Sequence, residues 1–482
     1  MMELLRREKM RDAWISYKYW AINWMNINRF FLSMPITVLK GMFRYPWMYD
    51  LLKTNALALR HAEGRTGRQQ EAILLYFSMA VKDVNDMLTD ALVNTERLVL
   101  TEDMLPPEII CAMGLIPWTV EIPGILIPMM DQHAADKYMD RSQNEGLPGD
   151  TCSLPRATMG TILEGHVPDG VAILSTNMPC DGGMASYAKL QEVTGLPTYR
   201  LDVPYNFRDD DAIDLFVEDL KGMISFLEEN TPGWMDWDKL RRNCENYNRL
   251  NKIEMERFDL LTADPPPLVG DSVTLPHWYC FNARPVTMEF IETYQRIFEL
   301  MKANYDEGKP AIRNQRYRAL LWNPMPSVYT HVENWMERTW GIGIVMDMLT
   351  YGYTDSLDTS SNDAMLRSLA KRYMWGTMAR HTRGPVSNFL DDIWGAYAKF
   401  KCDMIIMAAH VGCKSTMGML GVLREECRKR KIPLLVFEYE LMDSRVCSRQ
   451  GIRDQINNFM KNVMKAEPSD PGLLVIDDTM AW

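Results

Sequence analysis

The chain has 482 residues, which predicts at least two domains because one hydrophobic core seldom serves so long a chain. A hydrophobic content of 47% and a charged content of 24% are typical of a folded protein, and the formal net charge of -11 argues against a nucleic-acid-binding or membrane-attracted surface. No apolar run is long enough to span a membrane, and the charged start lacks the apolar core of a signal peptide. We therefore expect a cytoplasmic protein with no nucleic-acid or membrane partner.

Residues 1–75 are predicted to form an N-terminal helical arm. The first 60 or so are rich in aromatic residues and show no alternation of strands and helices. From residue 67 to residue 92, apolar residues recur at helical spacing, which predicts a long amphipathic helix. Exposed aromatic side chains on this arm would suit contact with a partner subunit.

Residues 76–267 are predicted to form the first α/β domain. After Pro106 and Pro107, "EIICAMGLIPWTVEIP" indicates a helix, a turn and a strand. A helix over 153–166, the strand "GVAILST", the helix "GGMASYAKLQEVTG" and the strand "PTYRLDVP" follow, and this order predicts a parallel crossover unit. Residues 209–267 then indicate two long helices joined by a Gly/Pro turn and stopped by a run of three prolines.

Residues 268–482 are predicted to form a second α/β domain. A helix leads into a strand-like stretch over 287–323, and "WGIGIVMDM" is a strand followed by helices over 361–381 and 387–401. The strand "CDMIIMAAH", the helix "STMGMLGVLREECRKRK", the strand "IPLLVFEYEL" and a helix over 448–467 complete it. The expected fold is therefore α/β, with two Rossmann-like parallel-sheet domains and a helical arm.

Two of the nine cysteines stand where ligands bind in open parallel sheets, outside the carboxyl ends of the strands, and a third begins a neighbouring helix. Cys180 follows the strand "GVAILST", Cys413 follows "MIIMAAH", and Cys152 begins the helix before the strand of Cys180. A helix N-terminus favours the thiolate, which is the metal-binding form. A reducing cytoplasm and an odd number of cysteines make a disulfide framework unlikely to be the explanation.

Residue types and spacing alone leave three interpretations of these cysteines open. Three thiolates around one cleft would suit an iron–sulfur cluster with an exchangeable iron or a catalytic zinc. The spacing matches no short ferredoxin or zinc-finger pattern, so three unrelated buried thiols are the third interpretation. The sequence contains no GxGxxG after a strand and no GxxxxGK[ST], so the chain lacks an evident nucleotide loop of its own.

Taken together, several stretches resemble the 2-hydroxyacyl-CoA dehydratase / benzoyl-CoA reductase family. They are "LPPEIICAMGLIPW", "DTCSLPRATMG", "PDGVAILSTNMPCDGG", "TGLPTYRLDVPYN", "HVGCKS" and "KIPLLVFEYELMDSR", in the family's order, and they cover about residues 70 to 465. The arm departs from the shorter family members, and its length is similar to that of the larger subunit of a heterodimeric dehydratase.

The resemblance implies a [4Fe–4S] cluster in the interdomain cleft, held by Cys152, Cys180 and Cys413. It implies elimination of water from an (R)-2-hydroxyacyl-CoA to a 2-enoyl-CoA through a ketyl radical, after one-electron activation. It also implies a second homologous subunit, a separate ATP-hydrolysing iron–sulfur activator and an acyl-CoA substrate, and it allows a flavin in the complex. A subunit of an ATP-dependent benzoyl-CoA-type reductase and a non-catalytic electron-relay or scaffold subunit are the alternative functions.

Other residues near these motifs are weaker candidates. Glu108, in the Pro-Glu motif, and Ser153, beside Cys152, are the candidate catalytic residues, although each also suits a plain role at a helix N-terminus. His410 is expected to form a hydrogen bond near Cys413 rather than to bind metal. Arg156 and Lys414 would either meet the phosphates of CoA or be solvated.

Overall fold

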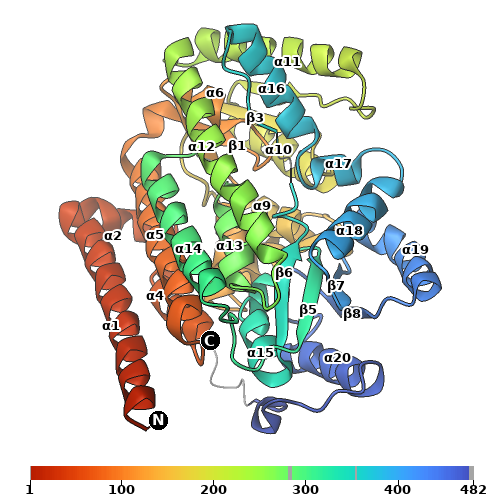
Figure 1. Ribbon diagram of the computed structural model, residues 1–482. Coiled ribbons are helices and arrows are strands. Elements are labelled where there is room, and N and C mark those ends of the chain that lie inside the picture. The colour runs from red at the N-terminus through yellow and green to blue at the C-terminus, as the bar shows by residue number, and fades with distance from the viewer. Residues whose placement is uncertain (1, 281–284, 353–354, 477–482) are drawn as a thin grey trace.

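The computed structural model describes residues 2–280, 285–352 and 355–476 and consists of two parallel sheets, the helices around them and an N-terminal helical arm (Figure 1). The arm lies on one side, and the second sheet lies at the opposite end of the molecule from α11 (Asp210–Asn230). This architecture confirms the expected fold class.

The first sheet has four parallel strands in the order β2-β1-β3-β4. Every residue of β1 and β3 is buried, as in a parallel sheet covered on both faces. The strands are β1 (Leu98–Thr101), β2 (Ile116–Thr119), β3 (Ala172–Thr176) and β4 (Thr198–Leu201). The helices between and after them are α6 (Pro107–Ala112), α7 (Ile122–Met130), α8 (Asp136–Asn144), α9 (Ser153–Leu163) and α10 (Asp181–Thr194).

The second sheet repeats this order, as β6-β5-β7-β8, and all its strands are parallel. The strands are β5 (Tyr317–Trp322), β6 (Ile342–Asp347), β7 (Met404–His410) and β8 (Leu434–Tyr439). The surrounding helices are η2 (Ser327–Tyr329), α15 (Val332–Trp340), α16 (Asn362–Met374), α17 (Ala379–Thr382), α18 (Ser387–Lys399), α19 (Lys414–Arg430), α20 (Arg449–Asn462) and η3 (Pro471–Leu473).

The strand order creates one topological switch point in each sheet, where successive connections leave in opposite directions. The switch point lies between β1 and β3 in the first sheet and between β5 and β7 in the second. Crevices at the carboxyl ends of such strand pairs are the usual ligand sites of open parallel sheets.

The arm is helical throughout the part that the structure describes. It comprises α1 (Met2–Ser33), α2 (Pro35–Arg44), α3 (Met48–Leu51), α4 (Thr54–Ala62) and the long α5 (Gly67–Val93), followed by η1 (Thr95–Arg97). One side of α1 buries Ile15, Tyr19 and Phe30 against the molecule, whereas its outer side exposes Trp14 and Trp24. The apolar outer side fits the expectation that the arm meets a partner.

Long helices connect the two sheets. They are α11, α12 (Trp237–Leu261), α13 (Asp271–Cys280) and α14 (Met288–Asp306). The side chains of Asp209 and Asp236 cap α11 and α12 by accepting hydrogen bonds from the N–H groups of Ala212 and Lys239. The predicted pair of long helices is therefore confirmed.

The sequence predictions missed some short elements. The four-residue β1 lies before the expected start of alternation, and α7, α8 and α13 were not predicted. The helix expected over 361–381 is divided into α16 and α17, with Met378 between them at φ 63°. The proposed boundary between the arm and the first domain, after residue 75, falls within α5, and the boundary after residue 267 falls between α12 and α13.

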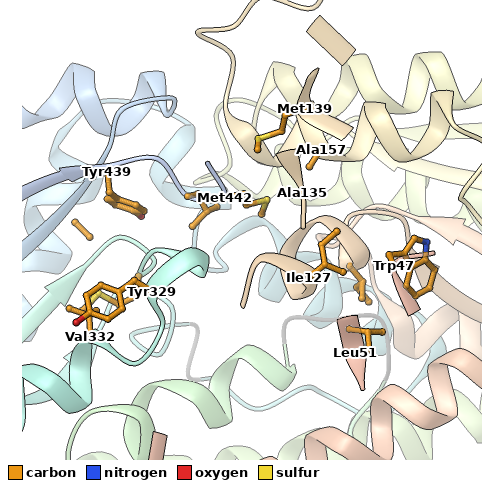
Figure 2. Close-up of a cluster of buried hydrophobic side chains, with 14 of the residues drawn as sticks. Trp47, Leu51, Ile127, Ala135, Met139, Ala157, Tyr329, Val332, Tyr439 and Met442 are labelled. Atoms are coloured by element: carbon orange, nitrogen blue, oxygen red, sulfur yellow. The ribbon is translucent and has the colours of Figure 1, made fainter. Parts of the chain in front are cut away.

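One apolar cluster crosses the arm and both α/β parts (Figure 2). Trp47 and Leu51 of the arm lie in it with Ile127 and Met139 of the first part. The second part contributes side chains that include Tyr329, Val332, Tyr439 and Met442. Because interiors are close-packed, this shared core fixes the loops at the carboxyl ends of the two sheets relative to each other.

Candidate functional site

The three predicted cysteines each precede the first residue of a helix. Cys152 is the N-cap of α9, Cys180 that of α10, and Cys413 that of α19. Cys180 follows β3 and Cys413 follows β7, so each lies at the switch point of its sheet. The helix N-termini direct their N–H groups and the positive ends of their dipoles toward the thiols.

The packing of the cysteine loops brings the three residues together. A Cβ atom added to Gly412 would lie 2.9 Å from the Cα atom of Cys152, so the loop of Cys413 runs directly against that of Cys152. A Cβ atom on Gly182 would lie 3.0 Å from Pro155 in α9 and 3.8 Å from the sulfur of Cys180. We call Cys152, Cys180 and Cys413 the thiol site.

The thiols influence one another and are contacted by backbone N–H groups. Burial, the charge of Glu440 and the other two thiols raise the pKa of Cys152, while the N–H of Leu154 opposes this. Burial also raises the pKa of Cys180, against the N–H groups of Gly183 and Gly182. The sulfur of Cys413 accepts a hydrogen bond from the N–H of Thr416 at 3.5 Å.

These shifts change the expectation drawn from the sequence. Each thiol does stand at a helix N-terminus, but burial outweighs that favourable position at Cys152 and Cys180 and keeps the free thiols protonated. Metal binding at these residues would therefore release protons.

Glu440, immediately after β8, joins the two cysteine loops of different domains. Its carboxylate accepts hydrogen bonds from the N–H of Ser153 at 2.8 Å and from the N–H of Gly412 at 3.0 Å. His410 Nε2 lies 2.8 Å from Oε1 of the same carboxylate, which confirms a hydrogen-bonding role for this histidine. Burial would raise the pKa of Glu440, but the hydrogen bonds from His410 and Ser153 lower it to about 2, so this carboxylate is ionised.

The neighbouring candidates have structural contacts. The hydroxyl oxygen of Ser153 accepts a hydrogen bond from the N–H of Met442 at 3.1 Å, which again crosses between the domains. Arg156 is buried, with its guanidinium 3.7 Å from carboxylate oxygens of both Glu440 and Asp443, and is not solvated. Lys414 is exposed and pairs with Asp150 at 2.8 Å.

A group of buried acids that the sequence analysis did not identify lies at the carboxyl edge of the first sheet. Glu102 follows β1, accepts the N–H of Thr176 at 2.9 Å and faces α10, since a Cβ atom on Gly183 would lie 2.8 Å from its Oε1. Burial and the charge of Glu121 raise its pKa well above the usual value. Its charge also acts on Cys180, which places this acid beside the thiol site.

Glu121 and Tyr187 extend this acidic group. Burial and the charge of Asp103 raise the pKa of Glu121 well above its usual value, which favours the protonated form of this acid. Tyr187 Oη lies 2.5 Å from Oε2 of Glu121 and 2.7 Å from the carbonyl oxygen of Thr101. A protonated Glu121 can therefore donate to Tyr187, which in turn donates to Thr101.

Glu108 lies in different surroundings from the thiol site. Its carboxylate is buried, 2.6 Å from the guanidinium of Arg372, and accepts the hydroxyl of Tyr373 at 2.9 Å. Arg372 also stacks on the ring of Tyr247, 3.9 Å from its centre. These contacts join α6 to α16, and the catalytic role expected for Glu108 stays a prediction.

None of the other described cysteines forms a disulfide. Cys244, Cys402 and Cys427 are buried, and Cys111 and Cys447 are half-buried. The side chain of Cys280 lies outside the described residues. The buried thiols fit the expected packing role.

Two further features describe the site. Within residues 2–280, 285–352 and 355–476, no three His, Cys, Asp or Glu side chains converge tightly enough to chelate a single ion. The thiol site offers separate sulfur donors with backbone N–H groups near them. Across the same residues, no helix is both long enough and apolar enough to cross a membrane.

The fold and the thiol site thus define a class of protein: two parallel α/β domains whose switch points each present cysteines at helix N-termini. Comparison with known families identifies the class more closely. The family model described as "2-hydroxyglutaryl-CoA dehydratase, D-component" matches residues 104–463, about three quarters of the chain, and the chain belongs to this family. No curated protein matches the chain.

Proposed function

We propose that the chain is the cluster-bearing subunit of a cytoplasmic 2-hydroxyacyl-CoA dehydratase, which converts an (R)-2-hydroxyacyl-CoA into a 2-enoyl-CoA and water. The observation that supports this most strongly is the thiol site: three helix-capping cysteines from two domains, with the loops of Cys152 and Cys413 joined by Glu440. Membership of a dehydratase family adds independent support.

The proposed reaction overcomes a specific chemical difficulty. The hydrogen on the β-carbon of a 2-hydroxyacyl thioester is barely acidic, so direct elimination of water is unfavourable. One added electron converts the thioester into a ketyl radical anion, which expels the 2-hydroxyl group as hydroxide and makes the β-hydrogen acidic. After the β-proton leaves, the electron is returned, so turnover consumes no net reductant.

A [4Fe–4S] cluster on Cys152, Cys180 and Cys413 would supply low-potential electron transfer and an iron left open to an oxygen ligand. The residues of this chain would do the remaining work. Glu440 and His410 hold the cysteine loops in place. Glu102, beside Cys180, and Glu121, whose pKa values are both raised by burial, are the groups of this chain that would give a proton to the departing hydroxide and accept the β-proton.

The same proposal includes partners. Because the sequence has no nucleotide loop, we infer that a separate ATP-hydrolysing iron–sulfur activator delivers the electron. A second homologous subunit completes the enzyme, and the outer side of α1 offers it an apolar surface that includes Trp14, Tyr17 and Trp24. A helix that is apolar on opposite sides is expected to be covered on both.

The ligand set is tested by comparing two matched variants purified without oxygen. We expect Cys413→Ala to lose most of the bound iron and sulfide and the visible absorption of the protein. Cys244→Ala, which alters a buried thiol in α12, should retain them. A colourless wild-type protein, or equal iron in both variants, would contradict the proposal.

Catalysis is distinguished from electron relay by adding acyl-CoA esters to the iron-loaded protein. Binding of substrate at the open iron is expected to change the visible and electron paramagnetic resonance spectra. A spectrum that responds to no acyl-CoA would instead assign the relay role. A response only to aromatic acyl-CoA esters, with reduction of the ring, would assign the reductase role.

A further inference from the structure

A cavity lies between the arm, edge strand β2, α7 and the second domain. Its volume is about 160 Å³, which is room for a short acyl chain, because a cavity of about 150 Å³ can hold a benzene-sized group. The walls are mostly apolar and include Leu57 of α4, Phe77 and Met87 of α5, and Leu126 and Met129 of α7. We call this space the arm cavity.

The arm cavity adjoins the acidic group next to the thiol site. Thr119, the last residue of β2, lines the cavity, and its hydroxyl lies 3.5 Å from that of Thr101. Thr101 directly precedes Glu102, and its carbonyl oxygen contacts the hydroxyl of Tyr187. Glu121 also lies in the chain between Thr119 and Ile122, which both line the arm cavity, so this end of the cavity is next to the acidic group.

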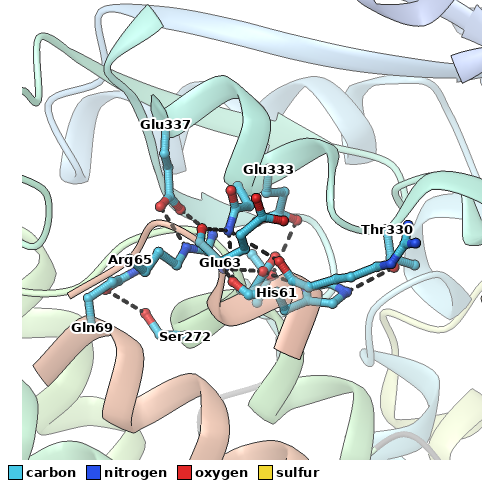
Figure 3. Close-up of polar contacts among 12 residues, drawn as sticks. His61, Glu63, Arg65, Gln69, Ser272, Thr330, Glu333 and Glu337 are labelled. Carbon is cyan, nitrogen blue, oxygen red and sulfur yellow. Dashed lines mark hydrogen bonds and ion pairs between the residues drawn. The ribbon is translucent and has the colours of Figure 1, made fainter. Parts of the chain in front are cut away.

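The charges around the arm cavity disfavour an anionic chain. Its described lining contains no lysine or arginine, and it includes the acid Asp83. The one histidine on the described wall, His61, already has hydrogen-bond partners at both ring nitrogens: Asp271 at 2.6 Å and Thr330 at 2.9 Å (Figure 3). A carboxylate buried here would have no cationic partner among the described lining residues and would keep a large desolvation cost.

A second cavity, lined by Asp103 and Arg372, does not offer an alternative place for an anionic chain. Its described lining contains one arginine, Arg372, and this side chain is already paired with the buried Glu108 at 2.6 Å. Asp103 and Glu254 add further acids to this wall.

We propose that the arm cavity binds the acyl chain of the substrate, and that this chain is apolar and carries no second carboxylate. The inference rests on the proposed function and narrows its substrate to uncharged 2-hydroxyacyl-CoA esters. It also gives the arm a part in substrate selection, because α4 and α5 form one side of the cavity.

The test measures binding of unreactive esters to the full-length protein, purified without oxygen together with its partner subunits. Isothermal titration calorimetry would compare 4-methylpentanoyl-CoA, glutaryl-CoA, acetyl-CoA and free CoA. We expect 4-methylpentanoyl-CoA to bind at least about tenfold more tightly than glutaryl-CoA, since an unpaired buried charge costs well over the ~1.4 kcal/mol that a factor of ten requires.

Two variants locate the binding site. Met129→Arg places a cation in the arm cavity and should tighten glutaryl-CoA binding while weakening that of 4-methylpentanoyl-CoA. Leu215→Arg, on the exposed face of α11, is the matched control and should change neither. Ala80→Phe partly fills the cavity and should weaken 4-methylpentanoyl-CoA more than acetyl-CoA, whose retained binding shows that the variant is folded.

Each contrary result has a distinct meaning. Glutaryl-CoA binding as tightly as 4-methylpentanoyl-CoA to the wild type would overturn the substrate inference and leave the proposed function intact. Unchanged selectivity in both cavity variants would overturn the location. Binding of no acyl-CoA at all would overturn the proposed function together with the inference.

Discussion

Glu440 accepts hydrogen bonds from N–H groups of both domains, Ser153 on one side and Gly412 on the other. Both donors are sequence neighbours of proposed ligands, so the position of this carboxylate sets the separation of Cys152 and Cys413. Its third contact is with His410. Glu440, His410 and Ser153 are all buried and together form a buried hydrogen-bonded group. Such groups stabilise a structure only while every member is paired.

The first prediction at the residue scale is that Glu440→Gln destabilises the fold. A glutamine has only one oxygen that can accept a hydrogen bond, so one of the buried N–H groups is left unpaired. We expect a loss of about 2–3 kcal/mol in the free energy of unfolding. Chemical denaturation of the apoprotein measures this. Glu438→Gln, on the exposed side of β8, is the control and should change stability by less than about 0.5 kcal/mol. Equal effects of the two changes would contradict the assigned role of Glu440.

The sequence indicated the three cysteines but not the groups that hold them. Their positions after apolar strands and before helices are local patterns, and these placed Cys180 and Cys413 at the correct sheet edges. Glu440 also follows a strand, in the stretch "FEYELMDSR", but its partner Ser153 is 287 positions away and no local pattern records that contact. Glu102 and Glu121 were missed for a related reason: β1 was not recognised, so their common sheet edge was not apparent.

At the scale of elements, the position of α9 depends on its close approach to α8. Gly160 in α9 lies against the backbone of Tyr138, and an added Cβ atom would be 2.0 Å from the carbonyl oxygen of Tyr138. Because α9 begins with the residue after Cys152, any displacement of this helix displaces part of the thiol site.

Replacing a glycine within a helix by alanine usually stabilises a protein. At Gly160 we expect the same replacement to destabilise it. We expect Gly160→Ala to lower the free energy of unfolding by about 1–3 kcal/mol, because the helices must move apart. Gly421→Ala in α19 meets nothing within 4 Å and should instead stabilise the protein by about 0.5–1 kcal/mol. Thermal unfolding of both variants checks the contrast, and a stabilised Gly160→Ala variant would show that α8 and α9 are not in the described contact.

The predictability of elements followed their length and periodicity. The long α11 and α12 carry enough helical turns, and clear enough caps, to be recognised from sequence. β1 has four residues between charged neighbours, and its burial comes from the strands on both sides of it. The break after α16 covers residues 375–378 and includes Met378 at positive φ, a conformation that its residue type does not predict.

At the scale of the whole molecule, a buried ionic group attaches the arm to the second domain (Figure 3). Arg65 follows α4 and pairs with Asp271 of α13 and with Glu337 of α15, whose Oε2 lies 2.8 Å from its Nε. Arg65 and both acids are almost completely buried. Removing the guanidinium of Arg65 would leave the buried carboxyl groups of Asp271 and Glu337 without their cationic partner.

We accordingly expect Arg65→Met to reduce the free energy of unfolding by about 3–5 kcal/mol. Arg68→Met removes a partly exposed pair with Glu307 and should cost less than about 1 kcal/mol. Denaturant unfolding, together with limited proteolysis of the arm, measures both. An Arg65→Met variant as stable as Arg68→Met would mean that the arm is not held by this group.

The same group predicts an acid-side loss of stability. Burial would raise the pKa of Asp271, but Arg65 and His61 outweigh it and lower that pKa below its ordinary value. A lowered pKa contributes stability above about pH 3.9, the usual pKa of an aspartate, and this contribution is lost as the pH falls further. In Arg65→Met the dependence on pH in this range should be weaker, and an unchanged dependence would exclude Arg65 as its source.

The long separation between the cysteines along the chain affects the order of events during synthesis. Cys413 lies 233 positions after Cys180, and Glu440 comes later still. At about 5–20 residues per second, the first two thiols leave the ribosome roughly 10–50 s before the third exists. In that interval neither the third ligand nor the Glu440 carboxylate is present, so a cluster assembled on this chain could be completed only after Cys413 had emerged, and Cys152 and Cys180 would need protection from oxidation until then.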